Sequence, residues 1–319
     1  MKNFVFLLVV VFFGSPLAKG LESGADQRLR TTFLQSAFQS GSMVVVVGDR
    51  GLVGVSRDFG TSFTASVALD DQLMLNSVQF IDENTGWAVG HGSSIVKTDD
   101  GGRTWKVQHQ DLTQDRPLFG VYFLNSKIGV AVGLWSLILR TEDGGATWNS
   151  LSPVVFGGSE QFDLNIYAVF GDGKHIYAAG ERGFVARSDD GGLTWEPMHV
   201  DYSGTFWTGG VNNNGDVFVA GLRGSAYVHS ADHAEWVRLE TQTKASITDV
   251  KFHNGDAFFS ALDGVSLRIP SGGGAARSRR GLAACRSRVF LSGAMGSHCI
   301  FLRKVLFSRY DDTVASLCR

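Results

Sequence analysis

The stretch TDDGGRTW at residues 98–105 decides the fold, because the chain repeats it. Related copies read SRDFGTSF at 56–63, TEDGGATW at 141–148, SDDGGLTW at 188–195 and a degenerate SADHAEW at 230–236. Successive copies start 42 to 47 residues apart, which is the length of one four-stranded blade of a β-propeller. The sequence therefore predicts an all-β propeller of antiparallel blades.

Each repeat contains four short β runs separated by turns. The second unit reads LNSVQFID, GWAVG, IVKTD and WKVQHQ over residues 75–110, and short polar or glycine-containing turns separate the runs. Six such units are countable, and the sixth begins at Ile247 and loses the repeated phrase after Arg268. A single blade cannot bury both of its faces, so we expect the blades to pack against one another around a ring.

The N-terminal segment differs in character from the repeated body. Residues 1–20 begin with Met-Lys, continue with an apolar run from Phe4 to Phe13 and end in small residues. This is the layout of a secretory signal peptide, and the apolar run is too short to span a bilayer. We therefore expect an exported mature protein, with residues 21–269 forming the propeller.

The C-terminal segment, residues 270–319, also stands apart. After residue 270 it carries eight arginines and one lysine against two aspartates, and it holds all three cysteines of the chain. An odd number of cysteines does not form a complete disulfide framework. The segment is a divergent closing blade, a natural extension or the product of a shifted reading frame, and it is long enough to hold a seventh unit.

The repeated phrase itself is predicted to do structural work. Its aspartates accept hydrogen bonds from turn N–H groups, its glycines supply positive φ, and its tryptophans pack between blades. These residues are Asp58, Asp100, Asp143 and Asp190, with Trp105, Trp148 and Trp195. The phrase resembles the Asp-box of bacterial neuraminidases, which joins the two outer strands of a blade away from the ligand face. The carboxylate ladder of a calcium loop is missing, so no metal site is predicted.

A second turn recurs eight or nine residues before the Asp-box. It reads G-x-R-G in three units, at residues 48–51, 180–183 and 221–224, and GHGS, GLWS or ALDG in the others. Successive turns of a blade alternate between the two faces, so this turn lies opposite the Asp-box.

The arginines of this second turn are Arg50, Arg182 and Arg223. They are either ordinary exposed turn residues or a convergent patch that binds carboxylates or an acidic peptide. Trp135, in the GLWS turn, could add stacking area. Nucleic acid is a poor candidate partner, because the body is acidic and carries no basic stripe.

GDRG or GERG turns in phase with DGGxTW, and GWAVG-like strands between them, resemble the photosystem II stability and assembly factor family of plants and cyanobacteria, and still more its exported bacterial relatives. The resemblance covers about residues 40–268. It implies a seven-bladed propeller without catalysis or cofactor, with Arg50, Arg182 and Arg223 contributing to an arginine-lined binding face.

The resemblance also implies a partner and a compartment. The partner would be a membrane-protein subunit or complex, either a photosystem reaction-centre subunit or, in non-photosynthetic bacteria, a transport complex. The protein would then work in the periplasm, or in the thylakoid lumen of a photosynthetic host.

A sialidase-like glycoside hydrolase is the alternative, because that class shares the Asp-box. It needs an arginine triad, a Tyr activated by a Glu, and an acid. Arg268-Ile269-Pro270 resembles a sialidase motif, but it follows the last Asp-box, whereas the sialidase motif precedes the first. Tyr122, Tyr167 and Tyr177 fall in predicted strands, where packing explains them. The sequence therefore favours a non-catalytic protein.

Overall fold

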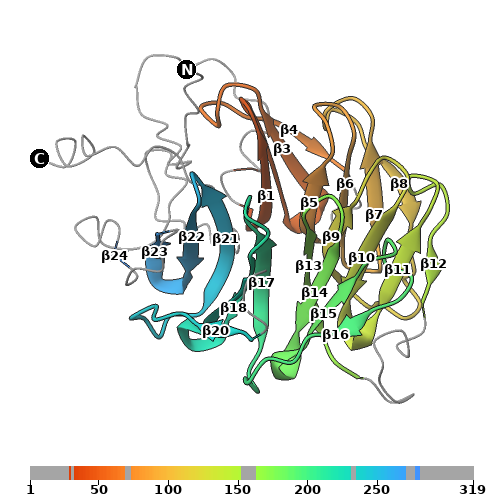
Figure 1. Cartoon of the computed structure of the whole chain (residues 1–319). Coiled ribbons are helices and arrows are strands. Elements are labelled where there is room, and N and C mark those ends of the chain that lie inside the picture. Colours follow the sequence, from red (N-terminus) through yellow and green to blue (C-terminus); the bar gives the residue numbers. More distant parts are fainter. Residues whose placement is uncertain are drawn as a thin grey trace, which may run out of the picture.

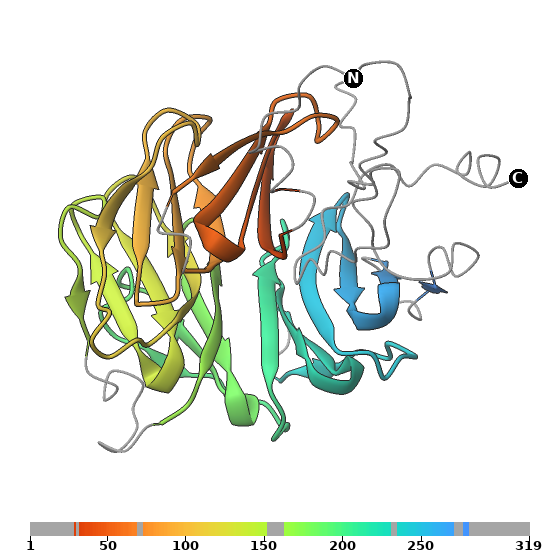
Figure 2. The same ribbon diagram turned by 180° about the vertical axis from the view of Figure 1, so that it is seen from behind.

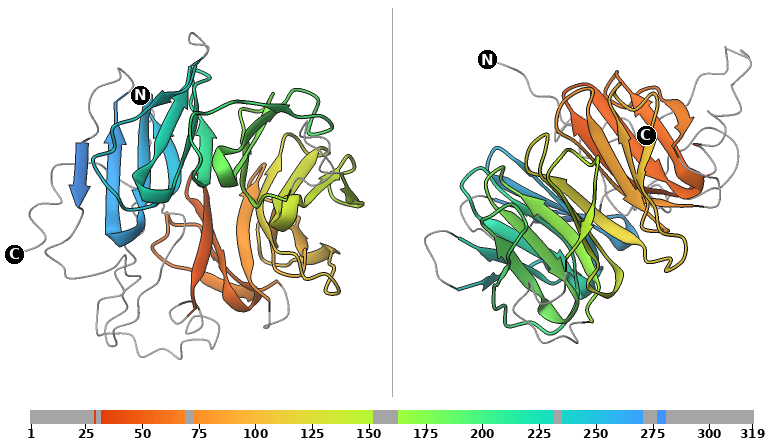
Figure 3. Two further views of the ribbon diagram at one scale, coloured as in Figure 1. Left: turned by 90° about the horizontal axis from the view of Figure 1, so that it is seen from below. Right: turned by 90° about the vertical axis from the view of Figure 1, so that its right-hand side faces the viewer.

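Four antiparallel strands form each blade, and six blades follow one another along the chain (Figure 1). The computed structural model describes residues 29, 32–68, 73–151, 163–230 and 235–270, together with the backbone of 277–280. Within these residues the blades succeed each other around a ring in sequence order, from the orange first blade to the blue sixth (Figure 3).

The strand bounds follow the predicted repeat. Blades one and two contain β1 (Leu34–Ser40), β2 (Met43–Gly48), β3 (Leu52–Ser56), β4 (Thr64–Val67), β5 (Leu75–Phe80), β6 (Gly86–Gly90), β7 (Ile95–Thr98) and β8 (Lys106–His109). Blades three and four contain β9 (Leu118–Phe123), β10 (Gly129–Gly133), β11 (Ile138–Thr141), β12 (Asn149–Ser150), β13 (Ile166–Gly171), β14 (Ile176–Gly180), β15 (Val185–Ser188) and β16 (Glu196–Pro197). Blades five and six contain β17 (Phe206–Val211), β18 (Val217–Gly221), β19 (Ala226–His229), β20 (Val237–Arg238), β21 (Ile247–His253), β22 (Asp256–Ala261), β23 (Val265–Ile269) and β24 (Arg277–Arg280).

The second strand of every blade is buried along its whole length. Both faces of such a strand pack against neighbouring blades, which explains continuous apolar runs such as MVVVVG and GVAVG. In blade two, Ala88 and Val96 pack toward blade one, whereas Val89 and Ile95 pack toward blade three. Similar apolar clusters join blades three to four, four to five and five to six.

The prediction of seven blades is wrong, because the described residues form six. Residues 277–280, which were available to begin a seventh unit, form β24 and pair with β23 from Arg268↔Arg277 to Val265↔Arg280. They therefore complete the sixth blade even though the Asp-box is lost there. Residues 1–20, which the sequence predicts to be a signal peptide, and the chain beyond residue 280 lie outside the described residues.

The junction between blades six and one differs from the other five. No apolar cluster in the described part of the chain joins these two blades. Next to the end of its second strand, blade six carries Ser260, and the five other blades carry Val47, Val89, Val132, Ala179 and Ala220. The Ser260 hydroxyl is buried and has no hydrogen-bond partner among the described residues. At this position blade six therefore presents a hydroxyl where the other five blades present an apolar side chain.

Candidate binding face

The turn between the second and third strands has the same backbone in all six blades. We call it the αL turn, because its third residue has a left-handed φ between 52° and 64°. The third residues are Arg50, Gly92, Trp135, Arg182, Arg223 and Asp263. Five of these turns contain the short helices η1 (Asp49–Gly51), η2 (Leu134–Ser136), η4 (Glu181–Gly183), η5 (Leu222–Gly224) and η6 (Leu262–Gly264). Figure 2 shows the last four as coiled ribbons along the lower side of the ring.

Backbone hydrogen bonds fasten each αL turn on its inner side. The N–H of the second residue donates to the carbonyl just before the first strand of the same blade, over 2.9–3.1 Å in all six blades. In blades one to four the N–H of the fourth residue also donates to the connection that enters the next blade, over 2.6–3.1 Å; Ser136 donates to Leu164, for example, and Gly183 to Gly204. These bonds hold the turn rigid and leave the third side chain directed outward.

Three of the outward side chains are arginines with free guanidinium groups. Arg50, Arg182 and Arg223 are exposed, and within the described residues their guanidinium groups form no hydrogen bond or ion pair. Other arginines are engaged: Arg187 bonds Asp189, and Arg268 bonds Asp256 at 2.7 Å. The free groups keep their full set of donors for a carboxylate.

The structure brings two of the three predicted arginines onto neighbouring turns. Arg182 and Arg223 belong to the adjacent blades four and five, whereas Arg50 belongs to blade one and is separated from Arg223 by blade six. All three occupy the same turn and hence the same face. Asp263 occupies the equivalent position in blade six, so the arginines do not form a complete ring.

The nearest acid to Arg182 in sequence is already occupied. The Glu181 carboxylate accepts the Asn165 N–H and the Asn165 side-chain amide, both at 3.0 Å, and the Tyr167 hydroxyl at 3.4 Å. These donors hold the carboxylate at the junction with the first strand of its own blade. Glu181 keeps its negative charge, since these donors are neutral, but it forms no ion pair with Arg182.

The third position of the αL turn is one where glycine is favoured. A left-handed φ costs a residue with a side chain on the order of 1 kcal/mol or more, and costs glycine almost nothing. Blade two uses Gly92, but the five other blades keep Arg, Trp or Asp there. Their side chains persist against the backbone preference, which marks this face as the candidate functional surface.

The Asp-boxes join the third and fourth strands, so they lie at the opposite ends of the blades. In blade two, Asp100 accepts the Thr104 N–H at 2.9 Å and the hydroxyls of Thr104 and Thr98 at 2.6 and 2.8 Å. The Thr98 oxygen in turn accepts the Gly102 N–H at 2.9 Å. Asp58, Asp143 and Asp190 make the equivalent bonds, while residues 231–234 of the fifth copy lie outside the described part.

The Asp-box tryptophans close the junctions between blades. Trp105 packs on the cluster of blades one and two and meets Phe80 edge-on. Trp148 packs at the junction of blades two and three, and Trp195 at that of blades three and four. The indole N–H groups of Trp105 and Trp195 donate to the second glycine of their own box at 3.1 and 3.2 Å.

These bonds stabilise the charged form of the carboxylates. Burial raises the pKa of Asp100, but the hydroxyl and N–H of Thr104 and the Thr98 hydroxyl outweigh it and lower the pKa to about 2. The N–H and hydroxyl of Thr147 lower the pKa of Asp143 to about 2. The pKa values of Asp58 and Asp190 are lowered by the same balance as that of Asp100. Carboxylates with such low pKa values are poor general acids or bases near neutral pH.

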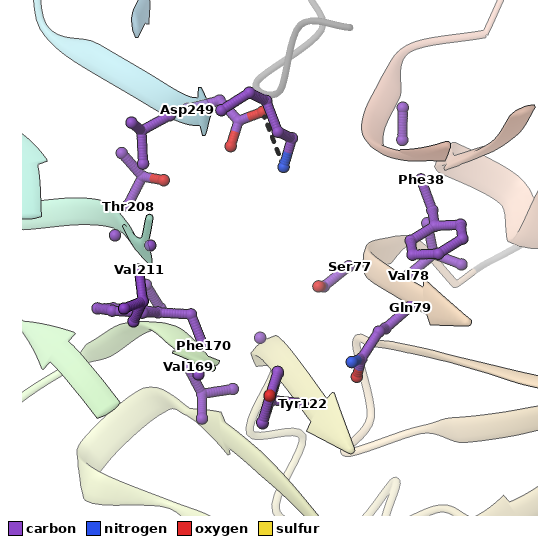
Figure 4. Close-up of a pocket in the computed structure, with 18 of the residues that line it drawn as sticks. Phe38, Ser77, Val78, Gln79, Tyr122, Val169, Phe170, Thr208, Val211 and Asp249 are labelled. Carbon is purple, nitrogen blue, oxygen red and sulfur yellow. Dashed lines mark ion pairs between the residues drawn. The ribbon is translucent and has the colours of Figure 1, made fainter. Parts of the chain in front are cut away.

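A central channel of about 770 Å³ runs between the first strands of all six blades (Figure 4). Its lining mixes apolar side chains such as Phe38 and Val169 with polar ones such as Gln79 and Tyr122. Asp249 is buried there, with a carboxylate oxygen 3.5 Å from the Lys251 ammonium. Sequence reasoning did not find Asp249, because its strand reads like the others and only its phase places it in the channel.

The described residues contain no helix that is long and apolar enough to cross a membrane. Over the same residues, no three His, Cys, Asp or Glu side chains gather as metal ligands. Arg268, the residue of the sialidase alternative, lies on β23, pairs with Asp256 and stacks over the Phe258 ring.

Comparisons with known proteins agree with the fold. The family model described as photosynthesis system II assembly factor YCF48 matches residues 61–273, about two thirds of the chain. A solved structure titled YCF48 bound to D1 peptide is 18% identical with a TM-score of 0.63, over 79% of this chain and 85% of that one. YCF48 from Cyanidioschyzon merolae is 19% identical with a TM-score of 0.63, over 78% of this chain and 86% of that one.

A third solved structure, an ancestral GH74 enzyme, is 13% identical with a TM-score of 0.62, over 78% of this chain and 39% of that one. No curated protein matches the chain.

Proposed function

We propose that this chain, which belongs to the family of the photosystem II assembly factor YCF48, is a non-catalytic propeller that binds a segment of a membrane protein through its αL-turn face. The observation that carries the proposal is the set of outward arginines, Arg50, Arg182 and Arg223, which have no partner among the described residues and are kept where glycine is favoured. Free guanidinium groups bind carboxylates through paired hydrogen bonds. The partner segment is therefore acidic or ends in a free carboxylate.

The N-terminal sequence supports a proposal for the place of action. Residues 1–20 have the pattern of a secretory signal, so we propose that the protein meets its partner outside the cytoplasm, in the periplasm or the thylakoid lumen. The related structure with a bound D1 peptide makes that peptide the first probe to use. Nothing among the matched proteins reported above points to a bacterial transporter.

The test replaces Arg50, Arg182 and Arg223 by Glu together and measures the affinity for the D1 peptide by fluorescence anisotropy. Glutamate keeps a side chain at the left-handed position, so the stability should change little. The matched control reverses three exposed charges on the Asp-box side, Arg103, Lys106 and Lys127. The proposal expects loss of binding in the first variant only. Equal affinities for the two variants would overturn it.

The glycoside hydrolase alternative has no specific support. The likeness to the GH74 enzyme is at 13% identity and concerns the fold alone. A fluorogenic sialoside assay with the wild-type protein and Arg268→Ala separates the two functions. Turnover that depends on Arg268 would contradict the proposed function.

A further inference from the structure

We propose that Trp135 is an aromatic anchor that binds an apolar side chain of the partner, beside the carboxylate bound by Arg182. The inference rests on the proposed function and adds the chemistry of the partner. The segment would carry an acidic group and, a few residues away, a phenylalanine or a similar apolar residue.

Trp135 is placed differently from the other tryptophans of the chain. It is 55% exposed, whereas the six others are buried or half-buried. It occupies the third position of the αL turn in blade three, the position that Arg182 and Arg223 occupy in blades four and five. Exposed tryptophans on a binding face supply much of the binding energy, because a large rigid ring loses little entropy on contact.

The backbone at Trp135 is held in a costly conformation. Trp135 and Ser136 both have left-handed φ values, 52° and 53°, which bulky residues adopt only when their surroundings impose it. Here the conformation is imposed by Leu164 and Asn165, which directly precede the first strand of blade four. The Asn165 side-chain oxygen accepts the Trp135 N–H at 3.1 Å, and the Leu164 carbonyl accepts the Ser136 N–H at 2.8 Å. The indole is therefore presented by a fixed turn.

The same asparagine joins the tryptophan to the neighbouring arginine turn. The Asn165 amide donates to the Glu181 carboxylate at 3.0 Å while its oxygen accepts from Trp135. Arg182 follows Glu181 directly, so one side chain bridges the two αL turns. Blades three and four lie side by side in Figure 1, and Trp135 and Arg182 belong to one surface.

The charge of this surface decides which group meets the indole. A cation from the partner could stack on the ring, but the Arg182 guanidinium on the neighbouring turn, which has no partner in the described part of the chain, would repel it. The Glu181 carboxylate keeps its negative charge, because its donors from Asn165 and Tyr167 are neutral, but they hold it at the first strand of its own blade and it forms no ion pair with Arg182, so it offsets the repulsion only in part. An uncharged apolar side chain next to an acid fits the surface best.

The experiment uses synthetic ten-residue peptides of glycine and serine that carry two aspartates and a free C-terminal carboxylate. One position is scanned with phenylalanine against serine. For the wild-type protein we expect one position at which phenylalanine tightens binding at least tenfold. Trp135→Ser should remove that gain, so that the phenylalanine and serine peptides bind this variant with equal affinity. Leu193→Ser, which removes a 45% exposed apolar side chain on the Asp-box side, should leave both affinities as they are.

The outcomes separate this inference from the proposed function. If no position prefers phenylalanine, or if Trp135→Ser keeps the preference, the anchor is wrong, and the arginine face stands provided the triple Arg→Glu variant loses both peptides. If that triple variant binds both peptides as tightly as the wild type, the arginine face itself is wrong. Failure of every peptide to bind the wild type would overturn both. A urea unfolding midpoint for each variant confirms that it is folded.

Discussion

The Asp-box and the αL turn of one blade differ in what is repeated from blade to blade. In the Asp-box the same side chains recur and bond within their own turn, as Asp100 does with Thr104 and Thr98. In the αL turn it is the backbone that recurs, while the third residue changes from an exposed Arg, Trp or Asp to the buried Gly92. The comparison teaches that repeated residues with satisfied bonds indicate a structural role. Unlike side chains on one repeated, strained backbone indicate recognition.

The largest effect is expected from Asp100→Ala, which removes the acceptor of the Thr104 N–H and two hydroxyls. The free energy of unfolding should fall by about 2 kcal/mol, measured by urea denaturation, while the folded protein keeps its affinity for the D1 peptide. The control is Asp99→Ala, because Asp99 is exposed and its ion pair is with Lys97, and such surface pairs contribute little. A weakened affinity for the D1 peptide in the Asp100 variant would contradict a purely structural role for the Asp-box.

The next prediction places an arginine at the third position of the αL turn in blade two, where the chain has Gly92. Gly92→Arg adds a side chain at a φ of 63°, and its Cβ would lie 2.6 Å from the end of the exposed Leu112 side chain, which can move away. Unfolding free energy should fall by about 1 kcal/mol. Ser126→Arg, at an exposed position outside the left-handed residues, should change it little. If Gly92→Arg is as stable as the wild type, the claim that residues other than glycine destabilise this left-handed position is contradicted.

A smaller effect is expected at the junction of blades six and one. Ser260→Val removes a buried hydroxyl that lacks a partner within the described residues and should raise the unfolding free energy by about 0.5 kcal/mol. The opposite change in a packed junction, Val89→Ser, should lower it clearly, because Val89 is fully buried among apolar side chains. Destabilisation by both substitutions would show that the face of blade six depends on its polarity.

The last of these predictions concerns pH. Asp100 and Asp143 have pKa values of about 2 in the folded protein, below the ordinary value of 3.8 that they regain on unfolding. Their stabilisation is therefore complete above pH 4 and is lost as the pH falls toward 2. Urea midpoints at pH 5, 4, 3 and 2 should drop less steeply for Asp100→Asn than for the wild type. Parallel curves would contradict the pKa assignment.

The repeat predicted the blades and their phase, because packing around a ring requires the same apolar pattern in every unit. It could not predict the number of blades. Strand β24 carries no Asp-box phrase and is held only by pairing with β23, so the sequence offered no sign that residues 277–280 belong to blade six.

The candidate face was predicted in part. The phase of the G-x-R-G turns indicated Arg50, Arg182 and Arg223, and the structure gives them a common turn. The left-handed backbone of Trp135 and the bridge from Asn165 to Glu181 depend on contacts between adjacent blades. The spacing within one repeat does not predict contacts between adjacent blades. From the sequence, Trp135 could therefore be predicted only as an aromatic residue flanking the arginine turns.

The most direct measurement is of stability and affinity on the same variant, Arg182→Gly/Arg223→Gly. Glycine relieves the left-handed backbone at both turns, so the unfolding free energy should rise by about 2 kcal/mol, about 1 kcal/mol for each turn. The same change removes two carboxylate-binding groups, so the affinity for the D1 peptide should fall at least tenfold. A variant that binds as tightly as the wild type, or that loses stability, would contradict the claim that these side chains are kept for recognition.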